Sequence, residues 1–187
     1  MIEKISDFFW RIANWKTFLL GLIVYLIFGG YVMPHGAKTF NDLSGKKVEV
    51  MDLQFFYTPE KVREIISQYS DAARNFAIQF GLMADTVYPV AYTFLFLIIT
   101  TLIFKGLAKY NITYKYLHLF PLIILPVDYF ENICVATLFK TYPNFSNALA
   151  YMATFFTTLK WCLVLLLLLI VVTGLITLAV KQFSKTN

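Results

Sequence analysis

Four long apolar stretches dominate the chain, and each is long enough to form a helix that crosses a lipid bilayer. They cover residues 17–33, 86–104, 117–139 and 149–180. A membrane-spanning helix needs roughly 20 mostly apolar residues, and the helix bonds its own backbone polar groups where no water is present. The sequence therefore predicts an all-α integral membrane protein with four transmembrane helices in a single membrane domain.

The segment between the first two stretches, residues 34–84, is more polar and predicts an outward-facing insert. Its first part, His35 to Lys47, contains Gly36, Asn41, Ser44 and Gly45 and is typical of a loop. A Thr-Pro-Glu sequence at Thr58 then predicts a helix start, because threonine caps helices, proline fits the first turn and glutamate complements the positive end of the dipole. Apolar residues recur at helical spacing from there, so we predict one amphipathic helix at about 59–83.

Composition supports a membrane location. Hydrophobic residues make up 59% of the chain and charged residues only 14%, whereas soluble domains carry about 25% charged residues. The net charge of +5 would favour a nucleic-acid partner in a soluble protein. Here the cations flank the apolar stretches, which is typical of membrane topology signals. We therefore expect the lipid bilayer, and no nucleic acid, as the partner of this surface.

The lysines and arginines of the short loops predict the orientation. They precede the first stretch, separate the second from the third and follow the fourth, whereas the loop between the third and fourth stretches keeps only Lys140. Because cations accumulate on the cytoplasmic side, we predict a multi-pass protein of the cell (inner) membrane with cytoplasmic N- and C-termini. Gly29 and Gly30 allow close helix approach, which leaves a homo-oligomer or a protein partner open.

Acidic residues interrupt the third apolar stretch. Asp128, Glu131 and Asn132 are spaced i, i+3 and i+4, so they share one helix face. A charged side chain in a bilayer costs several kcal/mol, roughly 3 on insertion scales, and therefore needs partners. Lys160 is the cation that can reach these acids from another span, and Arg74 in the insert is the next candidate.

The second span adds polar residues at the same depth. Gly81 could break the amphipathic helix, but without that break five residues fall near one face: Arg74, Gly81, Asp85, Tyr88 and Tyr92. Pro89 should bend this span and free a backbone carbonyl near Asp85. The candidate ligand-binding residues are therefore Arg74, Asp85, Tyr88, Asp128, Glu131, Asn132 and Lys160.

Several functions are compatible with this constellation. The charges could lock the helices together, line an outer-leaflet pocket for a small amphiphile, lipid or ion, or share a proton in a lipid- or isoprenoid-modifying enzyme. A non-catalytic sensor or accessory subunit of a larger assembly is a further alternative. The sequence contains no zinc-binding set, nucleophile elbow or phosphate loop. We therefore predict no metal and no cofactor, and leave enzymatic activity undecided.

Short motifs are spread over residues 50–165. They are DLQF from Asp52, YTPE from Tyr57, Asp85 with Tyr88, Pro89 and Tyr92, Asp128 with Glu131 and Asn132, and TLKW from Thr158. With these motifs the chain resembles a group of small bacterial four-helix integral membrane proteins of unassigned function. The resemblance implies the architecture and the choice of residues, but no activity. More loosely, the chain is similar to the emopamil-binding (EXPERA) family, although it has no histidine beside its acids.

Overall fold

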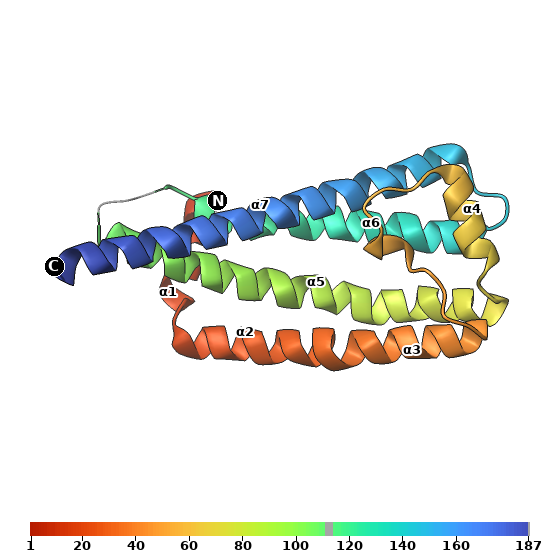
Figure 1. Ribbon diagram of the computed structural model, residues 1–187, viewed down its shortest axis with the longest axis horizontal. Helices are drawn as coiled ribbons and strands as arrows, with labels where there is room; N and C mark the ends of the chain where they lie inside the picture. The colour runs from red at the N-terminus through yellow and green to blue at the C-terminus, as the bar shows by residue number, and fades with distance from the viewer. Residues whose placement is uncertain (111–113, 187) are drawn as a thin grey trace.

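Figure 1 shows the computed structural model, which describes residues 1–110 and 114–186 and is helical without strands in that part of the chain. The elements are α1 (Ile2–Ile12), α2 (Trp15–Ile27), the π-helix η1 (Phe28–Val32), α3 (Met33–Ser44), the 3-10 turn η2 (Met51–Leu53), α4 (Pro59–Ser67), α5 (Asp71–Ala108), the 3-10 turn η3 (Leu117–Leu119), α6 (Pro121–Thr141) and α7 (Asn147–Thr186). Four helical segments are long and apolar enough to cross a membrane: Trp15–Ser44, Asp71–Ala108, Leu117–Thr141 and Asn147–Ser184. The prediction of an all-α protein with four such helices is confirmed.

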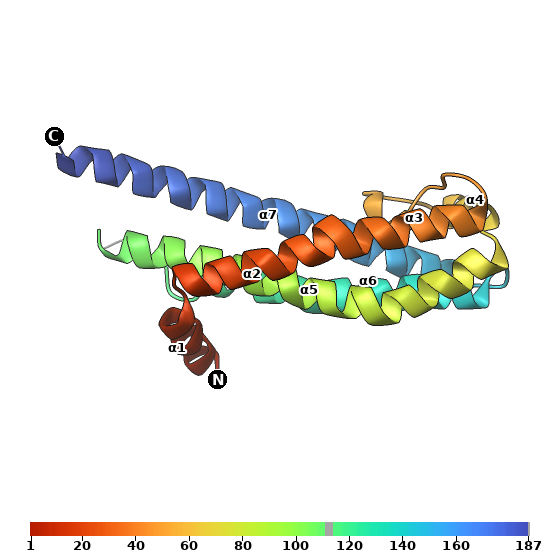
Figure 2. The same ribbon diagram turned by 90° about the horizontal axis from the view of Figure 1, so that it is seen from below.

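The four long segments form an elongated bundle around α5. Helices α2 and α3 run end to end along one side of α5, and α6 and α7 also contact it. Both ends of the chain lie at one end of the bundle, with α1, while α4 crosses the opposite end (Figure 1). Helix α1 stands across the bundle axis (Figure 2). An even number of passes thus brings the two ends of the chain together and places the insert opposite them.

The first long helix extends well beyond the predicted stretch, through Pro34. The helix widens into a π-helical turn at Phe28–Val32, where the Met33 N–H bonds to the carbonyl of Phe28. Proline lacks an N–H and its ring crowds the carbonyl four residues back, so a widened turn just before it relieves both problems. The helix then continues to Gly45, whose φ of 70° ends it in the left-handed conformation. The prediction of a loop directly after the first span is wrong.

The predicted amphipathic helix at 59–83 is divided between α4 and α5. The hydroxyl of Ser70 caps α5 by accepting a hydrogen bond from the Ala73 N–H at 3.0 Å. The same hydroxyl donates to the carbonyl of Leu43 near the end of α3 at 2.8 Å. A serine that caps a new helix interrupts the old one, so the break falls at 68–70. Gly81 lies inside the continuous helix α5.

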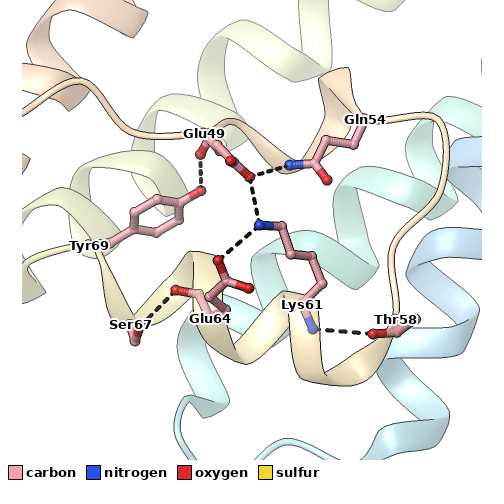
Figure 3. Close-up of polar contacts among 7 residues, drawn as sticks. All are labelled: Glu49, Gln54, Thr58, Lys61, Glu64, Ser67 and Tyr69. Carbon is pink, nitrogen blue, oxygen red and sulfur yellow. Dashed lines mark hydrogen bonds and ion pairs between the residues drawn. The ribbon is translucent and has the colours of Figure 1, made fainter.

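Polar contacts hold α4 to the segment that precedes it (Figure 3). The ammonium of Lys61 lies 3.3 Å from the Glu49 carboxylate and 3.0 Å from that of Glu64. Gln54 donates to the Glu49 carboxylate at 2.9 Å, and the Tyr69 hydroxyl donates to the Glu49 carbonyl. Exposed ion pairs of this kind contribute at most about 1 kcal/mol each. The buried apolar face of α4 therefore supplies most of its attachment.

Close packing of α3 against α5 depends on Gly36. A Cβ atom at this position would lie 2.2 Å from Cζ of the Phe80 ring. Gly36→Ala should therefore lower the free energy of unfolding by the ~1–3 kcal/mol typical of overpacking. At Gly30 a Cβ would meet nothing within 4 Å, so Gly30→Ala should be neutral or slightly stabilising. Unfolding of both purified variants, followed by circular dichroism, tests this; equal effects would contradict it.

Candidate functional site

Pro89 leaves one backbone carbonyl of α5 without its helical hydrogen bond, so another helix must supply the donor. It lies inside α5 and leaves the carbonyl of Asp85, four residues earlier, without its helical donor. The amide Nδ2 of Asn132 on α6 donates to this carbonyl at 3.2 Å. The Tyr129 hydroxyl donates to the next carbonyl, that of Thr86, at 2.8 Å. The predicted free carbonyl near Asp85 is confirmed, and it fastens α6 to α5.

Asp128 lies buried beside this contact and uses both carboxylate oxygens. Its Oδ1 accepts a hydrogen bond from Asn132 Nδ2 at 3.1 Å, and its Oδ2 accepts one from the Tyr92 hydroxyl of α5. The i, i+4 spacing on α6 thus produces one connected cluster of acid, amide and phenol.

Glu131 forms a separate buried contact. Its side chain is 0% exposed and pairs with the ammonium of Lys160 on α7, which is 13% exposed. The prediction that Lys160 reaches an acid of the third span is confirmed. Removing one member of such a buried pair commonly costs about 3–5 kcal/mol, because the other charge stays buried. This pair therefore joins α6 to α7.

Tyr57 anchors the insert on α7 close to that pair. Its backbone N–H donates to the Thr154 hydroxyl at 3.0 Å, and its own hydroxyl lies 2.9 Å from Oγ1 of Thr157. The tyrosine is 2% exposed. The sequence analysis did not include Tyr57 among the candidate site residues, although Tyr57 begins the YTPE motif.

Arg74 does not join the acids of the spans. It pairs with Asp71 on its own helix and donates to the carbonyl of Tyr69 at 2.8 Å. Its guanidinium carbon lies 4.9 Å from the ring centroid of Tyr142. These contacts hold the side chain at the α4 end of the bundle, so its predicted convergence with the other candidates is wrong.

Tyr88 faces α2 instead of the acids. Its ring stacks on Tyr25 with centroids 5.9 Å apart, and a Cβ at Gly29 would lie 3.2 Å from its hydroxyl oxygen. The ring also contacts the Tyr92 ring edge-on, with centroids 5.5 Å apart. Tyr88 therefore reaches the Asp128 cluster only through Tyr92. Nothing in the sequence set Tyr25 apart from the apolar residues around it.

A partly open cavity of about 140 Å³ lies between α3, α5 and α6. Of the seven candidate residues, it is lined by Asp85 and Asn132. The remaining wall is mostly apolar and aromatic, and includes Met33, Phe40, Phe76, Phe80, Val135 and Phe139. A cavity of about 150 Å³ accommodates a guest the size of benzene. The structure thus provides space for an apolar group beside one carboxylate and one amide.

Comparisons with protein-family profiles, curated proteins and solved structures find no match. Among the side chains that the structure describes, no group of three or more His, Cys, Asp or Glu is arranged to hold a metal ion. The residues that line the cavity supply a carboxylate, an amide and aromatic rings.

The carbonyl freed by Pro89 gives a direct test of the α5–α6 contact. Asn132→Leu should lower the free energy of unfolding by ~1–3 kcal/mol, because the carbonyl of Asp85 loses its donor in an apolar environment. In a Pro89→Ala background residue 89 has an N–H for that carbonyl, so the same substitution should cost less. Some cost should remain, since Asn132 also bonds to Asp128. Denaturant titration of the four proteins measures the difference; identical costs in both backgrounds would contradict this role of the carbonyl.

Proposed function

We propose that the protein is a multi-pass membrane protein of the cell (inner) membrane, with cytoplasmic termini and the insert outside. The four apolar helices support this placement, as do exposed apolar side chains such as Leu165, Leu169 and Ile176 on α7. Water-exposed apolar surface of that extent is unfavourable by about 25 cal/mol per Å². The cations of Lys16, Lys105 and other residues gather at the end of the bundle with α1, which is the cytoplasmic end under the positive-inside rule.

Reporter fusions test this orientation. Green fluorescent protein at the C-terminus should fluoresce, and alkaline phosphatase at the same position should be inactive, because the former matures in the cytoplasm and the latter outside it. Phosphatase inserted between Gly45 and Lys46, after the end of α3, should be active. The reverse pattern would contradict the orientation, and activity at neither position would contradict membrane insertion.

The cavity between α3, α5 and α6, we infer, binds the apolar part of a small amphiphile. The observation that carries this inference is the cavity wall, which is apolar except at Asp85 and Asn132. A small ion would lose its hydration against a wall that is mostly apolar, whereas an amphiphile buries its apolar part there and keeps its polar group at the carboxylate. The head group is therefore a cationic amine or another hydrogen-bond donor.

The neighbouring polar groups position this site. Asn132 is held by the Asp85 carbonyl and by Asp128, which is itself bonded by Tyr92. Asp128 and Tyr92 therefore act through Asn132, not by contact with the guest. The Glu131 ion pair fixes α6 against α7 and so keeps the cavity wall in place.

Photolabelling in proteoliposomes tests the cavity. A diazirine-bearing alkylamine should label α3, α5 and α6, as mapped by mass spectrometry of the peptides. Ala77→Phe should prevent this labelling, because Ala77 lines the cavity and a phenyl ring fills a space of that size. Leu82→Phe is the matched control, since Leu82 lies on the same helix but is 70% exposed.

The carboxylate is tested separately. Asp85→Asn should weaken labelling by the alkylamine about tenfold, because a hydrogen bond to a charged group contributes ~1.5–3 kcal/mol. Labelling by the corresponding alkyl alcohol should fall less. Equal labelling of the Ala77→Phe and Leu82→Phe proteins, with unchanged unfolding temperatures, would rule out occupation of this cavity.

A further inference from the structure

A second cavity, of about 270 Å³, lies under α1 at the end of the bundle opposite α4. Helix α1 forms one side, and the end of α5 and the segment leading into α6 form the other. Its wall combines aromatic rings of Trp10, Phe104 and Tyr114 with charged groups of both signs. None of the residues of this cavity takes part in the site described above.

Specific contacts hold α1 across the bundle and so maintain the cavity. His118 is 3% exposed, its Nε2 lies 3.2 Å from the Ser6 hydroxyl, and its ring meets Trp10 edge-on with centroids 5.5 Å apart. The Lys105 ammonium donates to the carbonyl of Ala13 at 2.7 Å, just after the end of α1. Helix α1 is therefore docked at Ser6 and Trp10, which line the cavity, and just beyond its C-terminal end at Ala13.

One carboxylate of the cavity, that of Glu3, already pairs with an ammonium of the protein itself, that of Lys115. Glu3 and Asp7 lie one turn apart on α1, and both line the cavity. The Glu3 carboxylate accepts a hydrogen bond from the Tyr116 hydroxyl at 3.0 Å and lies 3.4 Å from the Lys115 ammonium. The hydrogen bond from Tyr116, and then the contact with Lys115, lower the pKa of Glu3, so it is ionised at neutral pH. The Lys115 ammonium also lies 5.0 Å from the centroid of the Tyr116 ring.

We propose that this cavity binds the head group of a phospholipid that carries both an ammonium and a phosphate, as an aminoethyl phosphate does. The carboxylates of Asp7 and Glu3 receive the ammonium, and the rings of Trp10 and Tyr114 flank it. Lys115, whose side chain is 72% exposed, is long enough to contact the phosphate while it stays beside Glu3.

The position of the cavity favours a lipid as the source of this head group. It lies where α2 begins at Trp15, where α5 ends at Ala108 and where the third span begins at Leu117. Beside its charged face, α1 exposes Ile2 and Phe8, as helices at a membrane surface do. A volume of 270 Å³ is below the roughly 300–1,000 Å³ of sites for drug-sized ligands, so only the head group fits and the acyl chains stay in the bilayer. This inference rests on the membrane placement proposed above, and not on occupation of the cavity between α3, α5 and α6.

Native mass spectrometry of the full-length protein in detergent tests the proposal by titration with three probes. Dihexanoylphosphatidylethanolamine should bind about tenfold more tightly than dihexanoylphosphatidylglycerol, because the latter lacks the ammonium that the carboxylates bind. Free phosphoethanolamine should bind more weakly than the lipid, because it lacks chains to cover the apolar residues of α1. Equal affinity for the two lipids, or equal affinity for the lipid and the free head group, would overturn the proposal.

Substitutions locate the binding. Asp7→Asn and Glu3→Gln should each weaken binding of the phosphatidylethanolamine about tenfold and reduce the preference for it. Asp42→Asn, at an exposed acid of α3, is the matched control and should have no effect. Lys115→Met should weaken both lipids, whereas Lys4→Met, at an exposed cation of α1 outside the cavity wall, should not.

A further control separates this proposal from the preceding one. Ala77→Phe fills the cavity between α3, α5 and α6 and should leave this titration unchanged. Wild-type affinity in the Asp7→Asn and Glu3→Gln proteins would rule out the cavity under α1 as the binding site, whatever the outcome of the photolabelling.

Discussion

A backbone carbonyl that lacks its own helical donor determines how the middle of this bundle is arranged. In apolar surroundings an unpaired carbonyl costs about 1–3 kcal/mol, so the one that Pro89 frees on Asp85 must find a donor on another helix. Asn132 is that donor, and its amide then also meets Asp128. This contact links α6 to α5 beside the buried acid and at the edge of the cavity between α3, α5 and α6.

The two halves of the bundle are held by different means. Toward α4, polar side chains join the neighbouring helices. Asn132, Tyr129 and the Tyr92–Asp128 contact link α5 and α6, and the Glu131 ion pair links α6 and α7. Toward α1, α5 and α7 approach through small residues, because a Cβ at Gly106 or Gly174 would lie within 3.0 Å of a side chain of the facing helix. Buried polar contacts add little net stability, but they allow only one relative placement of the helices. The cavity between α3, α5 and α6 lies in the half that these polar contacts hold.

Hydropathy and spacing were enough to predict four long apolar helices, the contact of Lys160 with an acid of α6 and the carbonyl freed by Pro89. The continuation of the first helix was not predicted, because Pro34 normally ends a helix, whereas here the π-helical turn before it lets the helix continue. The separation of Tyr88 from Asp85 has a geometric cause: residues three apart on a helix differ by about 60° around its axis. That difference directs Tyr88 to α2 and Asp85 to the cavity, and only the packed structure shows which neighbour each one meets.

The length of the helix that runs through Pro34 affects the depth of the cavity relative to the bilayer. Trp15–Ser44 contains 30 residues and is about 45 Å long, whereas the hydrocarbon layer is only about 30 Å thick. In the proposed orientation its last turns rise above the acyl chains together with the first turns of α5, and the cavity lies between them. A guest bound as proposed would lie at the boundary between lipid and water, within reach of the aqueous phase as well as of the outer leaflet.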